Sequence, residues 1–124
     1  MDNSFVERVS WEEVDKYLNK VVELVRSRPY SGVYGIPRGG SVLAAWLSHK
    51  LYIPLLYFPD NYSVIIDDIY NTGDDLGQCL EEYNISGEKY FVTTMYKGEE
   101  APDDLIHFAY RVKGEKWIAF PWEQ

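Results

Sequence analysis

The fold of this chain is decided by residues 64–76, which read VIIDDIYNTGDDL. An apolar run rich in β-branched residues ends in two adjacent carboxylates, Asp67 and Asp68, and a short polar loop then leads into a segment of helical character. This pattern is typical of a buried strand that opens into a loop at the carboxyl edge of a parallel sheet, where α/β folds bind ligands. Paired carboxylates there suit sugar hydroxyls or a divalent metal. The Thr72-Gly73 turn before a helix suits a phosphate, because backbone N–H groups point outward at a helix N-terminus.

A plain strand-end turn, or a solvated loop, is the alternative interpretation of the same Asp-Asp pair. The remaining segments of the chain decide between these interpretations. Ser10 and Glu13 form a capping-box pattern, and apolar residues at helical spacing behind them predict a helix from Trp11 to about Ser27, ended by Pro29.

Helical and extended segments alternate after this first helix. Two further helices are expected, at Ser41–Leu51 and Asp75–Tyr83. Strands are predicted at Val33–Ile36, Pro54–Phe58, Ser63–Asp67, Lys89–Tyr96 and Ile106–Val112, the last near an edge, and a short terminal segment at Trp117–Trp122.

This alternation implies βαβ units, and hence an α/β fold with a parallel sheet in a single domain spanning residues 1–124. Right-handed crossovers place the loops after the strands at 33–36, 63–67 and 89–96 along one sheet edge. Topology therefore brings Arg38-Gly39-Gly40, residues 67–75 and Lys97 toward one crevice.

Composition narrows the class of protein. The chain has 124 residues with 46% hydrophobic content, enough to bury one core. A net charge of −8 argues against binding to nucleic acid or an anionic membrane surface. The single cysteine, Cys79, cannot form an internal disulfide, and its place in an apolar helical pattern indicates a small core residue. No signal-peptide pattern or membrane-spanning run is found, so we expect a soluble, cytoplasmic protein.

Three further motifs contain residues that could bind a ligand. The loop Arg38-Gly39-Gly40 lets the backbone approach an anion closely, although it also suits an ordinary turn. Lys97 closes the strand at 89–96, where many lysines are merely solvated. Residues 116–123 read KWIAFPWE, which suits either a terminal strand packed on the core or an aromatic face for a planar ligand.

Together these segments resemble the type I phosphoribosyltransferases over roughly residues 11–122, in the family's order. Residues 64–76 resemble the phosphoribosyl pyrophosphate (PRPP) motif, and Arg38-Gly39-Gly40 resembles the pyrophosphate loop of 6-oxopurine members, which often carries a non-proline cis peptide. Residues 117–122 resemble the Trp-Ile/Val-x-x-Pro-Trp element of bacterial xanthine–guanine phosphoribosyltransferases. The resemblance implies a minimal form of the Rossmann-like fold of that family, in which homo-oligomers are common.

The resemblance also implies an activity: transfer of phosphoribose from PRPP to N9 of hypoxanthine, guanine or xanthine, with Mg²⁺ as cofactor. Catalytic roles fall on Asp67, Asp68 and Asn71, and the metal on Asp67 and Asp68. Purine binding falls on Lys97 at the C6 oxygen, on Trp117 by stacking, and on Ile118 beside it. The residues expected to bind PRPP are Arg38, Gly39, Gly40, Thr72, Gly73, Asp74 and Asp75.

Three features depart from the family pattern. Only residues 59–62 separate the expected second strand from the PRPP-motif strand, where the family inserts a long hood loop that shields the reaction from water. Asn71 stands where purine members often have an aspartate, and an amide cannot take a proton. Asp74-Asp75 replaces a small residue and a threonine, so Asp75 repels a phosphate unless it turns away as a helix N-cap.

These departures leave two alternatives to an enzyme. One is a catalytically degenerate module that binds a purine or nucleotide, or regulates through it. The other is a scaffold that uses the fold only for assembly.

Overall fold

We describe the chain from a computed structural model that covers residues 6–26, 28–85, 90–97, 106–112 and 116–123. Helices and strands alternate through most of it, as the sequence predicts. The elements are β1 (Val6–Arg8), α1 (Trp11–Val25), β2 (Val33–Gly35), α2 (Gly39–Leu51), β3 (Val64–Tyr70), α3 (Asp74–Glu82), β4 (Tyr90–Tyr96), β5 (Ile106–Arg111), β6 (Trp117–Ala119) and a terminal 3-10 turn (Pro121–Glu123).

The central sheet has the strand order β2-β3-β4-β5, and every neighbouring pair is parallel. The predicted parallel α/β fold is thereby confirmed, as is the edge position of β5. Because all four strands run in the same direction, the carboxyl ends of β2, β3 and β4 share one edge of the sheet. This is the edge at which the sequence places the candidate site.

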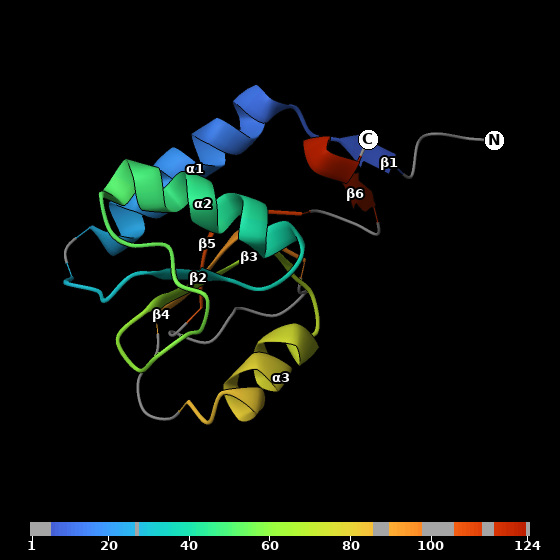
Figure 1. Cartoon of the computed structure of the whole chain (residues 1–124). Coiled ribbons are helices and arrows are strands. Elements are labelled where there is room, and N and C mark those ends of the chain that lie inside the picture. The colour runs from blue at the N-terminus through green and yellow to red at the C-terminus, as the bar shows by residue number, and fades with distance from the viewer. Residues whose placement is uncertain (1–5, 27, 86–89, 98–105, 113–115, 124) are drawn as a thin grey trace.

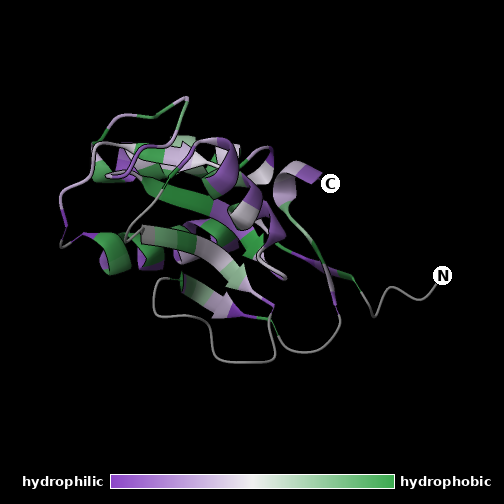
Figure 2. Ribbon diagram, turned by 90° about the horizontal axis from the view of Figure 1, so that it is seen from below, coloured by the Kyte–Doolittle hydropathy of each residue, from purple (hydrophilic) through white to green (hydrophobic). Residues whose placement is uncertain are grey.

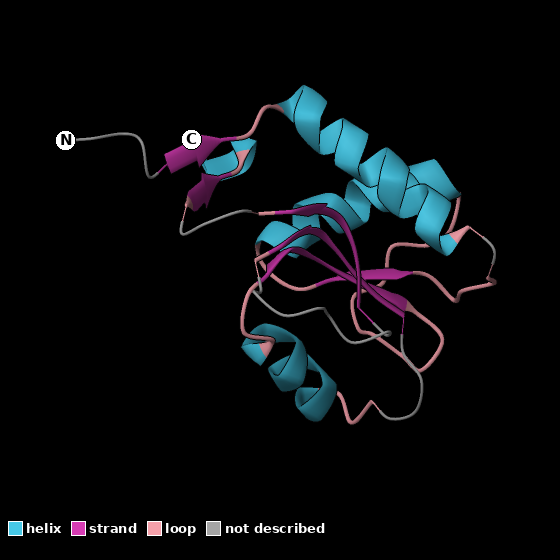
Figure 3. Cartoon of the chain, turned by 180° about the vertical axis from the view of Figure 1, so that it is seen from behind, coloured by secondary structure: helices cyan, strands magenta, loops and turns pink. Residues whose placement is uncertain are grey.

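Helices cover the two faces of the sheet unequally. The helices α1 and α2 lie together on one face, and the shorter α3 lies on the other (Figures 1 and 3). Side chains alternate along β3 accordingly: Val64 and Ile66 join the core beneath α1 and α2, while Ile65 joins the cluster beneath α3. Hydrophobic residues are accordingly concentrated in the central strands (Figure 2). Cys79 of α3 is buried, as predicted.

The predicted capping box starts α1. The Ser10 hydroxyl accepts a hydrogen bond from the Glu13 amide at 3.1 Å, and the Glu13 carboxylate accepts one from the Ser10 amide at 3.2 Å. The helix ends at Val25, two residues before the predicted end. Its apolar face is fully buried through Val14, Leu18 and other residues at helical spacing.

The predicted strand at Pro54–Phe58 is wrong. Only Leu55 forms a bridge, to Val33, fixed by hydrogen bonds from the Val33 amide to Pro54 and from the Leu56 amide to Val33. Beyond Leu56 the chain leaves the sheet, and Tyr57 and Phe58 are exposed. The apolar pattern of this segment is therefore that of a surface loop with one bridge, and β2 is the edge of the sheet.

Three boundaries differ from prediction near the candidate site. The helix α2 begins at Gly39 rather than Ser41, so both loop glycines belong to its first turn. The strand β3 continues through the Asp-Asp pair to Tyr70, since its pairing with β4 extends that far. The helix α3 begins at Asp74 rather than Asp75. The predicted strand start at Lys89 lies outside the described residues.

A second, two-stranded sheet lies beside the main one. In it β1 pairs in parallel with β6, and the Val9 amide donates to the Ala119 carbonyl at 2.9 Å. The sequence pattern did not predict the strand at Val6–Arg8. This small sheet fixes the C-terminal segment beside the carboxyl edge of the main sheet. Within the described ranges, none of the helices is long and apolar enough to cross a membrane.

Candidate active site

Three adjoining hollows lie at the carboxyl edge of the sheet. We call them the tryptophan hollow (Asp68, Ile69, Asn71, Lys97, Trp117, Ile118, Phe120, Glu123), the arginine hollow (Arg38, Gly39, Val42, Asp68, Trp122, Glu123) and the acidic hollow (Asp67, Ile69, Tyr70, Asn71, Thr72, Gly73, Asp74, Asp75, Leu76, Phe91). Asp68 and Glu123 line both the first and the second, while Ile69 and Asn71 line both the first and the third. The three hollows therefore form one continuous site.

The tryptophan hollow joins three parts of the chain. Lys97 follows the last residue of β4, and its amide donates to the Tyr70 carbonyl at 2.8 Å, which fixes it beside the end of β3. Trp117 opens β6 with 67% of its surface exposed, whereas Ile118 is buried. An exposed indole beside an ammonium group offers one flat apolar face and one hydrogen-bond donor to a ligand.

The arginine hollow is built on the loop between β2 and α2. The peptide bond between Pro37 and Arg38 is cis, in agreement with the expectation for this loop. A Cβ at position 40 would lie 2.5 Å from the Ile66 carbonyl oxygen, so only glycine there lets the loop approach β3 this closely, and Gly39 lies directly against the Asp68 carboxylate. Arg38, at the start of α2, thereby lies in the same hollow as Asp68.

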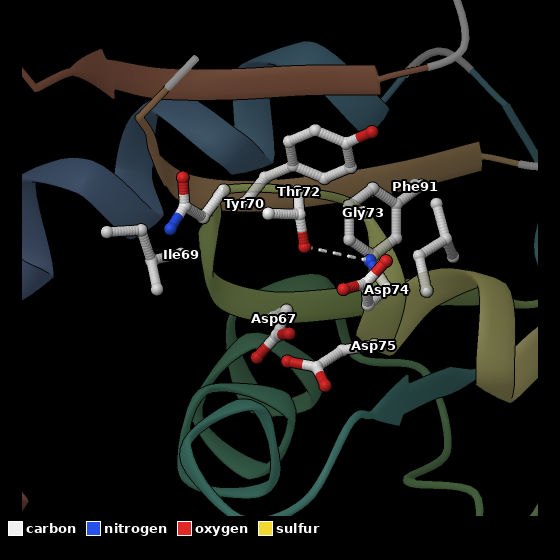
Figure 4. Close-up of a pocket in the computed structure, with 10 residues that line it drawn as sticks. Asp67, Ile69, Tyr70, Thr72, Gly73, Asp74, Asp75 and Phe91 are labelled. Carbon is white, nitrogen blue, oxygen red and sulfur yellow. Dashed lines mark hydrogen bonds between the residues drawn. The ribbon is translucent and has the colours of Figure 1, made fainter.

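The acidic hollow is formed by the turn between β3 and α3. Gly73 caps α3 in a left-handed conformation with φ of 84°, which glycine tolerates without strain. The Asp74 amide donates to the Thr72 hydroxyl at 3.4 Å, as the dashed line in Figure 4 shows. The rings of Tyr70 and Phe91 wall one side with an edge-on contact.

The N-cap interpretation of Asp75 is wrong, because Gly73 is the cap and Asp75 lies within the first turn of α3. Figure 4 shows its carboxylate turned toward Asp67 rather than toward Thr72. Asp75 therefore avoids the centre of the turn while keeping the hollow acidic.

Asp67 and Asp68 are consecutive residues of β3 and point into different hollows. Asp67 is 6% exposed, and its Oδ1 accepts from the Asp68 amide at 2.8 Å. Asp68 is half-buried, and its Oδ1 accepts from the Ile69 amide at 2.8 Å. The carboxylates thus accept from the two backbone amides that, in a regular strand, would donate to a neighbouring strand.

The environment of this pair favours retention of a proton. Burial, followed by the neighbouring charge of Asp68, raises the pKa of Asp67 to about 8. Burial also raises the pKa of Asp68, with a contribution from the Glu123 carboxylate. Two neighbouring carboxyls, one buried and one half-buried, resist double ionisation unless a cation compensates their charge.

A divalent cation suits these carboxylates as part of a complex with a ligand. No group of three potential metal-ligating side chains occurs among the residues that the structure describes. Mg²⁺ does not require such a cage, because it is usually bound by one or two carboxylates together with phosphate oxygens of a substrate. Asp68, open to both the tryptophan and the arginine hollow, has the position and the oxygen chemistry for this arrangement.

All the predicted site residues lie around this edge of the sheet. Apart from Gly40, which is buried behind β3, each of them lines at least one of the three hollows. The sequence analysis missed Glu123, Tyr70 and Phe91. Glu123 had a signal, because it is an acidic residue in the same short C-terminal segment as Trp117. The two rings carried no signal, since aromatic residues in β strands are usually core.

No family model matches the chain. Among curated proteins, it is 24% identical to a xanthine-guanine phosphoribosyltransferase from Chromohalobacter salexigens, over an alignment of 138 positions that covers 93% of this chain and 82% of the relative. Among solved structures, a purine phosphoribosyltransferase from Pyrococcus horikoshii superposes with a TM-score of 0.78 at 27% identity, covering 96% of this chain and 95% of that one.

A third relative shares the fold at lower identity. It is the xanthine-guanine-hypoxanthine phosphoribosyltransferase of Helicobacter pylori, with a TM-score of 0.76, 18% identity and coverage of 95% of this chain and 93% of that one. All three relatives are transferases, in line with the expectation that leaned toward an enzyme. The order of the motifs, the parallel fold and these similarities agree, and they support the resemblance of the chain to the type I phosphoribosyltransferase family, with purine phosphoribosyltransferases among the proteins it is similar to.

Proposed function

We propose that the chain is a purine phosphoribosyltransferase that transfers phosphoribose from PRPP to N9 of a 6-oxopurine, releasing pyrophosphate. The observation that carries the proposal is the meeting of Lys97, Trp117 and Asp68 in one hollow. That hollow continues on one side into the arginine hollow and on the other into the acidic hollow. The proposal assigns the base, the pyrophosphate and the sugar 5′-phosphate to one hollow each, around the carboxylate of Asp68.

The tryptophan hollow supports the choice of a 6-oxopurine. The Lys97 ammonium has hydrogens to donate and no lone pair to accept with, so it favours a carbonyl oxygen over an amino group at C6. The exposed Trp117 indole offers a stacking surface for the ring, and the buried Ile118 lines the same hollow. Relatives that act on xanthine, guanine and hypoxanthine support the same substrate class.

The arginine hollow is the proposed pyrophosphate site. Arg38 supplies positive charge, and Gly39 and Gly40 stand in the first turn of α2, at the positive end of the helix dipole. Asp67 and Asp68 would hold Mg²⁺ together with the ribose hydroxyls and pyrophosphate. When bound, Mg²⁺ neutralises charge on the departing pyrophosphate.

The proposed transfer is a single displacement. The purine reacts as its N7–H tautomer: the lone pair of N9 forms the new bond to C1′ while the C1′–oxygen bond breaks, that electron pair leaves with pyrophosphate, and the N7 proton passes to water. Asn71 lies between the tryptophan and acidic hollows, where its amide can orient the base but cannot accept a proton. The chain therefore contributes positioning and electrostatic stabilisation rather than covalent catalysis.

A binding module without turnover is the second candidate, and the acidic hollow is the observation that favours it. Asp67, Asp74 and Asp75 all line the place where a 5′-phosphate would sit. The same fold could then keep a purine in the tryptophan hollow while losing PRPP.

The test is an incubation of the protein with PRPP, Mg²⁺ and equal amounts of hypoxanthine, guanine, xanthine and adenine, followed by mass detection of nucleoside monophosphates. We expect products of the oxopurines only. Asp68→Asn should lower their formation by at least about 100-fold, because the variant removes the carboxylate shared by two hollows. Asp15→Asn, which removes an exposed carboxylate ion-paired with Lys50, should leave it unchanged.

Absence of product from the wild-type protein would reject the enzyme. Calorimetric titration with guanine and with its nucleotide then separates the remaining functions: binding would identify the purine-binding module, and no binding of either would leave the scaffold.

A further inference from the structure

We propose that Thr94, a buried residue of β4 outside all three hollows, is a positioning residue that holds Asp68 in place. The proposal rests on the proposed function for its kinetic consequences, whereas its structural part concerns only the contact between β3 and β4. Thr94 is fully buried, and its hydroxyl donates a short hydrogen bond to the Asp68 carbonyl.

The strand pairing around Asp68 is irregular. Pairs between β3 and β4 pass from Asp67–Thr93 directly to Ile69–Met95. The pairs between β4 and β5 likewise pass from Thr93–Phe108 to Met95–Tyr110. A gap in the ladder therefore runs across two neighbouring strand pairs at the level of Asp68 and Thr94.

Side chains satisfy the backbone at this gap. The amides of Asp68 and Ile69 donate to the carboxylates of Asp67 and Asp68, as described above. The Asp68 carbonyl accepts from the Thr94 hydroxyl. Leaving a partly buried carbonyl without a partner is costly, so this hydroxyl stabilises the irregular conformation over a regular strand.

The irregularity changes which way the side chains point. Ile65 lies beneath α3, and a regular alternation would place Asp67 and Ile69 on that side too. Ile69 instead packs against the core beneath α1 and α2, on the side where Asp68 meets Gly39. Asp67 and Asp68 themselves keep the regular alternation, which directs Asp67 into the acidic hollow and Asp68 into the other two, and the direction changes only at Ile69, next to the gap.

A second hydrogen bond connects β3 and β4 two residues beyond Asp68. The Lys97 amide donates to the Tyr70 carbonyl, so β4 contacts β3 at both ends of the segment that carries the site. Thr94 therefore sets the place of Asp68 relative to Lys97.

Thr93 provides a matched control. It is the neighbouring residue, it is also fully buried, and its hydroxyl donates to the Met95 carbonyl at 2.9 Å within β4 itself. Thr93→Val and Thr94→Val each remove one buried hydroxyl while keeping the shape of the side chain. Only Thr94→Val removes a hydrogen bond to β3. Thr94→Ser keeps the hydroxyl and serves as the rescue.

The first measurement is hydrogen–deuterium exchange at the amides of Asp68 and Ile69. Thr94→Val should speed exchange there by about tenfold or more, corresponding to the loss of one buried hydrogen bond. Thr93→Val should leave these amides at the wild-type rate, and Thr94→Ser should restore it. Equal exchange in both valine variants would overturn the structural role, whether or not the protein is an enzyme.

The second measurement is steady-state kinetics with Mg²⁺ and PRPP. Thr94→Val should raise KM for PRPP about tenfold, while Thr93→Val, although similarly destabilised, should not. A wild-type protein without turnover would reject the proposed function, and the exchange measurement would still decide the role of Thr94. Altered exchange with unchanged KM in an active enzyme would overturn the positioning role.

Discussion

The tryptophan hollow and the acidic hollow lie on two sides of Asn71, yet they differ in chemistry. The first combines a cation, an exposed indole and a buried isoleucine, which together suit a neutral planar ligand with a carbonyl oxygen. The second presents Asp67, Asp74 and Asp75, and none of the described residues that line it is basic. The chemistry of the tryptophan hollow therefore matches its proposed ligand, a purine. The negative charge of the acidic hollow instead repels its proposed ligand, the 5′-phosphate of PRPP.

This contrast shows how the two candidate functions divide within one molecule. In both proposed functions, the enzyme and the binding module, purine binding would depend on the tryptophan hollow alone. Turnover additionally requires a dianionic phosphate beside carboxylates. Changes confined to one hollow should therefore separate binding of the base from binding of PRPP.

The largest effect on the base-binding half should come from Lys97→Met, which keeps the length of the side chain and removes its charge. A charge-assisted hydrogen bond is worth about 1.5–3 kcal/mol, so affinity for guanine should fall about 10- to 100-fold. Calorimetric titration with guanine and with adenine measures the change. A weaker preference for guanine over adenine is expected, and an unchanged preference would contradict the role of Lys97.

Trp117→Ala should have the next largest effect. Stacking of one base on an aromatic side chain is worth about 1–3 kcal/mol, so purine affinity should fall by at least about fivefold for every purine alike. Fluorescence or calorimetric titration measures it, with Trp117→Phe as the variant that retains a stacking face. Trp11→Phe is the control, because Trp11 is half exposed but contacts Trp46 and Trp122 outside the tryptophan hollow. Loss of affinity for only one purine would argue against stacking.

The sequence predicted the half of the site that depends on local patterns. Asp67, Asp68 and Thr72 follow an apolar run, and a run of that kind followed by polar residues indicates that the carboxyl end of a strand is near; β3 ends at Tyr70, between them. The failure at Pro54–Phe58 has the opposite cause. Its apolar residues have the pattern of a strand, but only Leu55 finds a partner, and the pattern cannot show that.

Features that depend on pairing between segments far apart in the chain could not be predicted from the sequence. The strand at Val6–Arg8 is three residues long and pairs with Trp117–Ala119 at the other end of the chain. Thr94 is likewise an ordinary β-branched strand residue until the gap in the β3–β4 ladder is seen. Glu123 enters the site only because the small sheet places the C-terminal segment at the carboxyl edge.

Asp75→Asn tests the unfavourable half of the site and should improve it. Removing one charge about 4 Å from a phosphate relieves about 1 kcal/mol in water, and more where the surroundings are less polar, so affinity for PRPP should rise about fivefold or more. Calorimetric titration with PRPP and Mg²⁺ measures the gain, and guanine affinity should stay constant. Glu81→Gln on the outer part of α3 removes the same charge away from the site and is the control. Weaker PRPP binding in Asp75→Asn would show that this carboxylate assists the ligand.

The smallest effect concerns stability and follows from the buried carboxyl of Asp67. Its pKa rises from an ordinary 3.8 to about 8 in the folded chain, so between these values the folded state holds a proton that the unfolded state has lost. The stabilisation is complete below about pH 4 and is lost as the pH rises toward 8, because the unfolded state then binds fewer protons than the folded state.

Asp67→Asn cannot ionise, and its amide oxygen can still accept from the Asp68 amide. We therefore expect the variant to melt about 3–6 °C above wild type at pH 8, with a smaller difference at pH 5. Thermal unfolding at both pH values measures this, with exposed Asp74→Asn as the control from the same hollow. A constant offset between Asp67→Asn and wild type would show that the Asp67 carboxyl does not hold this proton, and Mg²⁺ binding to the pair would then release none.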